Sequence, residues 1–347
     1  MNESVHELAN DSSDASAKMR TFNRELVSDI VNVRLSDDEL VEVLKQVSTL
    51  PVSAELMRLF IEETRKTVVG KEDLPAGAGL IDVSGTGGSG LAHFNTSTFC
   101  AFVLAAGHVN VGKFGNRASR SGAGSADLLE ALGIPLNLPA ARVGEVIERA
   151  GVAFLFAPQY YPGLKRLALA RKAVGRPTIF NHIGPLLNPL EPAYRVFGVS
   201  SQTVALPAAE YLEKLSSRVL IVTSQLGMDE LMPGIYNHVL LVHGGATRDL
   251  SFAASGSALF DGQDGKQLQF DLQHNLKVFS RLMEIRSQSE LYPWLDLVCL
   301  NAGAGFFVAG IVDSITDGIE HAKELIFSGR VKEKFDQVRL AYEKCAA

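Results

Sequence analysis

The stretch LIDVSGTGGSG, residues 80–90, starts as an apolar run and ends with four glycines in its last six positions. A short apolar run indicates a buried strand, and Asn-Thr-Ser-Thr at residues 95–98 is typical of a helix start. Glycine adopts positive φ without steric cost, so this loop can turn its N–H groups inward, beside the positive end of the helix dipole. The stretch therefore predicts a strand, a phosphate-binding loop and a helix in succession.

The loop departs from the two best-known phosphate motifs. It lacks the Gly-Lys-Ser/Thr ending of a Walker A loop, and it is not a well-formed G-x-G-x-x-G. Its glycine content alone also fits a tight strand-to-helix turn that binds nothing. Both interpretations remain open from this loop by itself.

From this loop to about residue 242, short apolar runs alternate with stretches long enough for a crossover helix. The runs that we expect to be strands are residues 80–83, 109–111, 153–156, 178–180, 219–222 and 238–242. Such alternation predicts an α/β fold whose central sheet is mainly parallel and buried, with helices on its faces.

The region upstream of the loop has helical periodicity instead. Ser36 and Glu39 have the spacing of a capping box, and an apolar stripe follows them at helical intervals. This stripe consists of Leu40, Val43, Leu44 and Val47. A second amphipathic helix is predicted to begin after Ser53.

Composition limits the classes of function. The chain has 347 residues, of which 33 are Lys or Arg and 39 are Asp or Glu, for a formal net charge of −6. An acidic balance argues against nucleic acid and anionic membranes as partners. No apolar run reaches the ~20 residues of a membrane span, and residues 1–18 lack the apolar core of a signal peptide, so we expect a cytoplasmic protein.

The cysteines indicate a reducing compartment. Cys100, Cys299 and Cys345 are odd in number, far apart and outside any C-x-x-C pair. A disulfide framework and a cysteine-ligated zinc site are therefore not expected.

A second loop carries positive charge near the end of the next predicted strand. Lys113, Arg117 and Arg120 lie in this loop. In a parallel sheet, ligands bind at the carboxyl ends of the strands, so these cations should face the glycine loop and suit a phosphate ligand. A solvated basic loop is the alternative. Farther on, Asp229 and Glu230 follow another predicted strand, where two carboxylates could hold Mg²⁺ or could simply lie on the surface.

Together, these motifs resemble the anthranilate phosphoribosyltransferase family, which joins anthranilate to phosphoribosyl pyrophosphate (PRPP) in tryptophan biosynthesis. The likeness extends from about Leu35 to Ile326. It is carried, in order, by residues 85–88, 94–98, Lys113, 115–117, 124–133, 156–158, Arg171, 178–189, 229–230 and 301–304.

The resemblance implies a small helical domain joined to a larger α/β domain with a mainly parallel central sheet, the nucleoside phosphorylase/phosphoribosyltransferase type of fold. It implies a disordered tail over residues 1–20 and a helical domain over 21–75 plus roughly 162–190. The α/β domain would then comprise residues 76–161 and 191–347. It also implies an active site between the domains and a homodimer formed through the helical parts.

The resemblance further assigns site residues by position, with Mg²⁺ as the cofactor. The expected PRPP-binding set is Gly85, Thr86, Gly87, Gly88, Ser89, Asn95, Ser97, Thr98, Lys113, Asn116 and Arg117. The expected acceptor-binding set is Phe114, Asn116, Tyr161, Arg171, Gly184 and Pro185. The expected metal ligands are Asp229 and Glu230, with Ser97 as a further candidate.

Five positions depart from the family pattern. Ser89 replaces an Asp of the glycine loop, Phe114 and Tyr161 each replace a His, Arg120 replaces a small hydroxyl residue, and His182 replaces an apolar residue. Most of the departures lie in the acceptor region. Transfer to anthranilate is the first expectation, and three alternatives remain: a paralogue with another aromatic acceptor, a pyrimidine nucleoside phosphorylase-like enzyme, and a nucleic-acid-binding relative.

Overall fold

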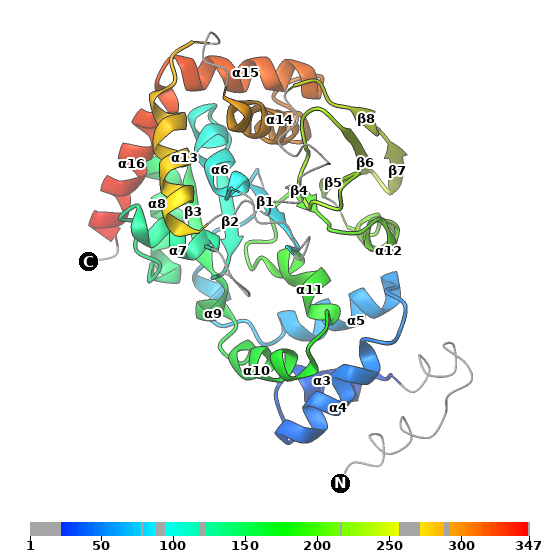
Figure 1. Cartoon of the computed structure of the whole chain (residues 1–347). Coiled ribbons are helices and arrows are strands. Elements are labelled where there is room, and N and C mark those ends of the chain that lie inside the picture. Colours follow the sequence, from blue (N-terminus) through cyan, green and yellow to red (C-terminus); the bar gives the residue numbers. More distant parts are fainter. Residues whose placement is uncertain are drawn as a thin grey trace.

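The computed structural model describes residues 22–77, 79–87, 94–117, 123–215, 217–256, 271–287 and 292–345. The tail predicted over residues 1–20 lies outside this described part, as do Gly88, Ser89 and Arg120. Figure 1 shows a group of helices beside one end of a larger α/β part.

The smaller part is made of helices from two separate regions of the sequence. The first region contributes α3 (Arg24–Val31), α4 (Asp37–Val47) and α5 (Ala54–Arg65), and the second contributes α10 (Leu164–Val174) and α11 (Ile179–Ile183). Short connecting elements are η1 (Lys71–Asp73) and α9 (Ala157–Tyr160).

The predicted capping box at the start of α4 is confirmed. Ser36 accepts a hydrogen bond from the Glu39 N–H, and the Glu39 carboxylate accepts one from the Ser36 N–H. The apolar stripe of α4 is buried, as its spacing predicts. The two sequence regions are tied by Arg166 of α10, which donates to the carbonyls of Val33 and Leu35.

The larger part is built on one sheet with the strand order β3-β2-β1-β4-β5-β6-β7. Its strands are β1 (Ile81–Gly85), β2 (Val111–Gly115), β3 (Val152–Phe156), β4 (Tyr194–Gly198), β5 (Arg218–Ser224), β6 (Tyr236–His243) and β7 (Ala246–Asp249), with β8 (Phe252–Ala253) paired to β6. The first five strands in this order pair in parallel, and β6 to β8 pair antiparallel.

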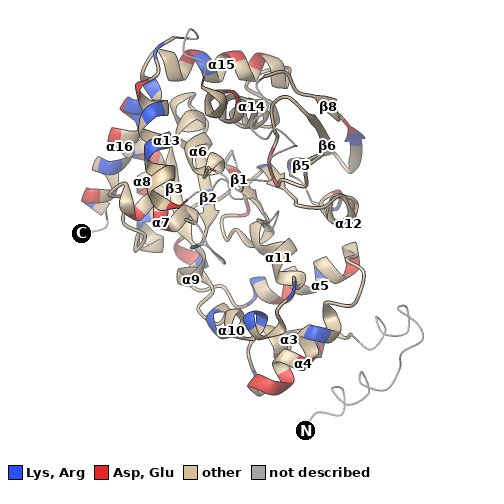
Figure 2. Cartoon of the chain, viewed as in Figure 1, with Lys and Arg blue, Asp and Glu red and all other residues tan. Residues whose placement is uncertain are grey.

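Helices complete the α/β part. They are α6 (Thr96–Ala106), α7 (Ser125–Ala131), α8 (Ala140–Ala150), α12 (Gln202–Leu212), α13 (Leu272–Glu284), α14 (Pro293–Val308), α15 (Ile315–Phe327) and α16 (Arg330–Cys345). Helix α6 is apolar on all sides and nearly all of its residues are buried, because it lies between the sheet and other helices. Basic and acidic residues are mixed on α13 and α16 (Figure 2).

The fold class expected from the sequence is confirmed, and one predicted strand is wrong. Residues 178–180 begin helix α11, because Thr178 and Asn181 form a capping box that apolar content alone does not reveal. Strand β4 was not predicted. The predicted domain boundaries stay a prediction. None of the described helices combines the length and apolar content needed to cross a bilayer.

Candidate functional site

The described start of the glycine loop, residues 85–87, lies at the carboxyl ends of β1 and β4. Gly85 ends β1, and Gly87 has a φ of +65°, a conformation that favours glycine. The N–H of Gly87 donates to Asp229 Oδ2 at 2.7 Å, and the N–H of Thr86 donates to the Gly198 carbonyl at 2.9 Å. The loop is therefore attached both to the neighbouring strand and to the predicted metal-binding carboxylate.

Two glycines leave room for Asp229. Gly85 and Gly198 are paired across β1 and β4. A Cβ on Gly85 would lie 2.1 Å from Asp229 Oδ2, and a Cβ on Gly198 would lie 1.7 Å from the Asp229 carbonyl oxygen. Gly198 belongs to no motif that the sequence reveals, although a glycine at the end of a strand signals close backbone approach.

The two predicted metal ligands lie between β5 and β6. Asp229 Oδ1 is buried and accepts no hydrogen bond from the described residues, and Glu230 is only 8% exposed. A buried carboxylate oxygen without a donor suits a cation. No three His, Cys, Asp or Glu side chains of the described residues form a metal cluster. A pair of carboxylates nevertheless fits Mg²⁺, which takes its other ligands from water and substrate phosphates.

Lys113 approaches the same region from β2. Its side chain is buried, and its Nζ donates to the Val83 carbonyl at 2.7 Å and to Ser97 Oγ at 3.0 Å. Burial lowers the pKa of Lys113, while the nearby carboxylates of Asp82 and Asp229 act in the opposite direction. This lysine therefore places a positive charge between β1 and the start of α6.

The start of α6 is the helix N-terminus predicted after the glycine loop. Asn95 is its N-cap residue, and its amide donates to the Ala123 carbonyl and to Asn275 Oδ1 of α13. Thr98 Oγ1 is buried and makes no hydrogen bond with the described residues. Asn275 is a site neighbour that the sequence does not predict, since nothing in the local sequence relates α13 to this helix start.

Arg117 is held away from the glycine loop. Its guanidinium pairs with Asp127 at 2.9 Å and with Glu130 at 2.7 Å, both on α7, and lies 5.5 Å from the ring centroid of Phe156. The N–H of Arg117 donates to Asn116 Oδ1. A role for Arg117 in PRPP binding stays a prediction.

The predicted acceptor residues come from both parts of the molecule: Arg171 lies on α10 of the helical part, whereas Phe114 lies on β2 of the sheet. Arg171 of α10 is half-buried, with its guanidinium 5.9 Å from the Phe180 ring centroid. Its Nε makes no hydrogen bond with the described residues. Burial lowers the pKa of Arg171, and burial together with the Arg171 charge lowers the pKa of His182. A Cβ built on Gly184 would meet no atom within 4 Å, so open space lies beside this residue.

The two aromatic departures form a buried pair. The rings of Phe114 and Tyr161 are 6.1 Å apart at 78°, an edge-to-face arrangement. They are 7% and 1% exposed. The Tyr161 hydroxyl donates to the Leu187 carbonyl at 2.7 Å, and burial raises the pKa of this tyrosine.

Residues 77–332 match the family model described as "Glycosyl transferase family, a/b domain". The chain is 38% identical over 266 residues to an anthranilate phosphoribosyltransferase of Persephonella marina, covering 75% of this chain and 76% of the relative. It is 35% identical over 321 residues to the enzyme of the same name from Lactococcus lactis subsp. cremoris, covering 90% and 92% of the two chains.

Two solved structures share the fold. The crystal structure of anthranilate phosphoribosyltransferase from Thermus thermophilus superposes with a TM-score of 0.79 at 31% identity, covering 99% of this chain and 100% of the other. The enzyme from Saccharomyces cerevisiae, solved in complex with PRPP and Mg, superposes with a TM-score of 0.81 at 22% identity, covering 98% of each chain.

Proposed function

The chain belongs to the anthranilate phosphoribosyltransferase family, and from this premise we propose that it transfers the phosphoribosyl group of PRPP to the amine of anthranilate, releasing pyrophosphate. It is then a pentosyltransferase of tryptophan biosynthesis. The observation that carries the proposal is the position of Asp229, packed against two strand-end glycines and bonded to the glycine loop.

The donor side would bind the phosphates of PRPP. The N–H groups of the glycine loop, the N-terminus of α6 and Lys113 all supply positive charge or donors to one region. Asp229 and Glu230 would hold Mg²⁺, with Ser97 as a further ligand. When bound, the metal neutralises charge on the departing pyrophosphate.

The acceptor side would bind anthranilate by its carboxylate. Arg171 would pair with that carboxylate, and Asn116, Gly184 and Pro185 would form the wall of the pocket. Departure of pyrophosphate builds positive charge at the anomeric carbon, which the anthranilate amine then attacks. Little side-chain proton transfer is needed, so the main contribution of the protein is to hold the amine in line with that carbon.

A different aromatic carboxylate is the second candidate acceptor. His182 adds a polar ring where the family pattern has an apolar residue. This ring is near enough to Arg171 for the guanidinium charge, together with burial, to lower the pKa of the imidazole. A panel of substituted benzoates, scored by pyrophosphate release, separates the two candidates. Anthranilate should have the highest kcat/KM.

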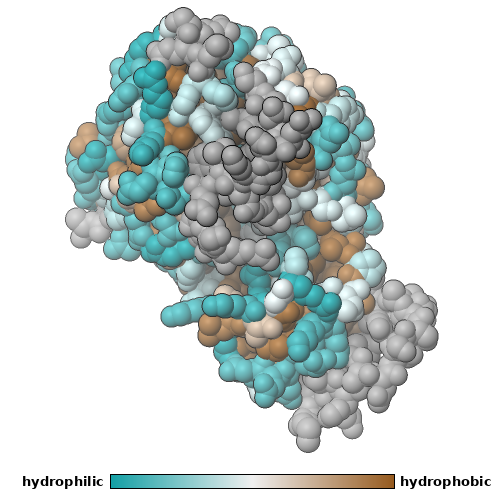
Figure 3. All heavy atoms as spheres, viewed as in Figure 1, coloured by the Kyte–Doolittle hydropathy of each residue, from teal (hydrophilic) through white to brown (hydrophobic). Residues whose placement is uncertain are grey.

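The proposal includes a homodimer and a cytoplasmic location. Leu169 of α10 is 69% exposed, and hydrophobic surface is visible where α10 lies (Figure 3). A hydrophobic surface on the helical part supports an interface there. The three cysteines are free thiols, which suits a reducing compartment.

Metal-dependent binding of PRPP tests the donor site. PRPP with Mg²⁺ should raise the melting temperature, because a ligand that binds only the folded state stabilises it. Replacing both Asp229 and Glu230 by Ala should remove the magnesium-dependent part of this rise, whereas Asp313→Ala, at an exposed carboxylate, should retain it. A rise of equal size with and without Mg²⁺ in the unmodified protein would contradict the proposal.

A further inference from the structure

Residues 185–188, here called the acceptor turn, are held by side chains from three different elements. The Pro185 carbonyl accepts from Arg195 Nη1 at 3.3 Å, and the Leu186 carbonyl accepts from Arg65 Nη2 at 2.9 Å. The Leu187 carbonyl accepts from the Tyr161 hydroxyl at 2.7 Å. Three consecutive carbonyls at the end of η2 (Gly184–Leu187) are thus bonded to β4, to α5 and to the residue after α9.

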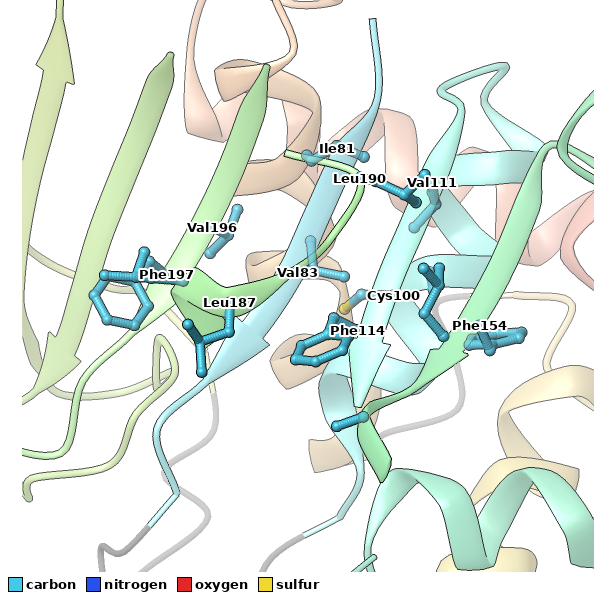
Figure 4. Close-up of a cluster of buried hydrophobic side chains, with 14 of the residues drawn as sticks. Ile81, Val83, Cys100, Val111, Phe114, Phe154, Leu187, Leu190, Val196 and Phe197 are labelled. Carbon is cyan, nitrogen blue, oxygen red and sulfur yellow. The ribbon is translucent and has the colours of Figure 1, made fainter. Parts of the chain in front are cut away.

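Asn188 fastens the acceptor turn to the sheet. It is fully buried, and its Nδ2 donates to Asp82 Oδ2 at 2.9 Å and to the Gly112 carbonyl at 2.8 Å. Its Oδ1 accepts from the Leu190 N–H at 3.0 Å. Figure 4 shows Leu187 and Leu190 over the face of β1 and β2, beside Phe114, Val83 and Val111.

Asp82 connects this turn to the donor side. It is fully buried in β1, its Oδ1 accepts from the Phe114 N–H, and its Oδ2 lies 4.0 Å from Arg195 Nη1. Phe114 is the residue directly after Lys113 on β2, so this hydrogen bond fixes the strand beside that lysine. One carboxylate therefore contacts both the backbone of β2, next to the lysine expected at the PRPP phosphates, and two residues, Asn188 and Arg195, that hold the acceptor turn.

We infer that Asp82 is a positioning residue, which keeps Lys113 and the acceptor turn in one fixed relation. The inference rests on the proposed function, since the turn carries Pro185 of the acceptor site and Lys113 belongs to the donor site. Transfer requires the acceptor amine and the anomeric carbon to be aligned, and a misplacement of ~1 Å can cost about 100-fold in rate. A single buried carboxylate, bonded to Asn188 of the turn and to the backbone of the residue after Lys113, supplies such alignment.

Tyr161 also holds the acceptor turn in place. Its ring packs edge-to-face on Phe114, and its hydroxyl is engaged by the Leu187 carbonyl. This tyrosine therefore acts on the acceptor through the turn, not by touching it. The same relation explains how an aromatic residue can stand at a position where the family pattern has histidine.

Steady-state kinetics of four variants test the inference. Asp82→Asn keeps the shape of the side chain but removes its charge, and Tyr161→Phe removes only the hydroxyl. Both should lower kcat with saturating substrates, Asp82→Asn by about tenfold or more. The double variant should lose less than the product of the two single losses, because both changes release the same turn.

Tyr342→Phe is the matched control. Tyr342 is also fully buried, and its hydroxyl accepts from the Phe154 N–H at 2.6 Å, in contact with β3 instead of the turn. This variant should lower the melting temperature and leave kcat and both KM values unchanged. Independent, multiplicative losses from Asp82→Asn and Tyr161→Phe would overturn the inference.

The other possible outcomes also test the inference or the proposed function. If Asp82→Asn does not fold, unchanged kcat and acceptor KM in Tyr161→Phe overturn the inference. If the unmodified protein turns over PRPP but both variants behave like Tyr342→Phe, the inference alone fails. If the unmodified protein has no turnover with any acceptor, the proposed function fails and the inference falls with it.

Discussion

Arg171 is the residue on which recognition of the acceptor depends in this account. Its guanidinium is half-buried over Phe180, with an Nε that bonds none of the described residues. A partly desolvated cation of this kind pairs strongly with a carboxylate. Asparagine and lysine cannot form the same bidentate pair with a carboxylate.

We predict that Arg171→Ala raises the acceptor KM, or lowers kcat/KM for the acceptor, by more than about tenfold, which corresponds to about 1.4 kcal/mol. The KM for PRPP should change little. Lys172→Ala is the control, because Lys172 is the exposed neighbour on the same helix. Equal losses for both substrates would show that Arg171 has a structural role.

His182 predicts a dependence of stability on pH. Burial, assisted by the Arg171 charge, lowers the pKa of its imidazole in the folded state. The unfolded chain therefore binds a proton more readily, and this contribution to stability is complete above about pH 6.5 and lost as the pH falls toward the folded-state pKa.

When the pH falls from 7.5 to 5, the free energy of unfolding should decrease less in His182→Leu than in the unmodified protein. The difference between the two decreases should be on the order of the contribution of one titrating group. Chemical denaturation at both pH values measures the difference. Identical pH dependence in the two proteins would mean that this imidazole titrates normally.

Among the elements, those with strong local signals were predicted and those set by distant contacts were not. The cap of α4 depends on residues within one turn, so the sequence sufficed. Residues 178–180 were predicted as a strand because short apolar runs do not separate strand from helix. Strand β4 was missed, although β1 and β5 enclose it.

In the candidate site, too, features with local signals were predicted and contacts between distant residues were not. The glycine loop and Asp229 were each expected, but the contact between them joins residues more than 140 positions apart. Asp82, Arg195 and Asn188 gave no motif of their own. Only the pairing of β1 with β4 brings the first two together, at one register position.

At the end of β4, Gly198→Ala should disturb the metal site. The added methyl group would overlap the Asp229 carbonyl oxygen, and a backbone atom cannot move aside cheaply. We predict that the variant folds with lower stability and loses magnesium-dependent PRPP binding by more than about tenfold, the effect of about 1.4 kcal/mol.

Gly163→Ala at the start of α10 is the matched control. An added Cβ there would meet its nearest atom at 3.7 Å, an ordinary contact, and φ is −61°. Isothermal titration with PRPP and Mg²⁺ compares the two variants. Unchanged binding in Gly198→Ala would show that the position of Asp229 does not matter for the donor.

The whole molecule combines a helical part, assembled from two sequence regions, with the sheet that carries the donor site. We propose that two copies associate through the helical part. Leu169→Glu on α10 should therefore convert a dimer into a monomer, because it places a charge in an apolar contact.

Leu340→Glu on α16 is the control for this substitution. Leu340 is 55% exposed, but α16 lies in the α/β part, away from the helical group (Figure 1). Light scattering coupled to size exclusion gives the mass of each variant. A dimer that survives Leu169→Glu, or one disrupted only by Leu340→Glu, would place the interface elsewhere.

The most direct test is turnover by the full chain with PRPP, Mg²⁺ and anthranilate, followed by mass spectrometry of both products. We predict equal amounts of pyrophosphate and of anthranilate carrying a phosphoribosyl group on its nitrogen. Omitting any one component, or replacing both Asp229 and Glu230 by Ala, should abolish their formation. Absence of both products in the complete mixture, or equal turnover by the Asp229 and Glu230 double variant, would contradict the account.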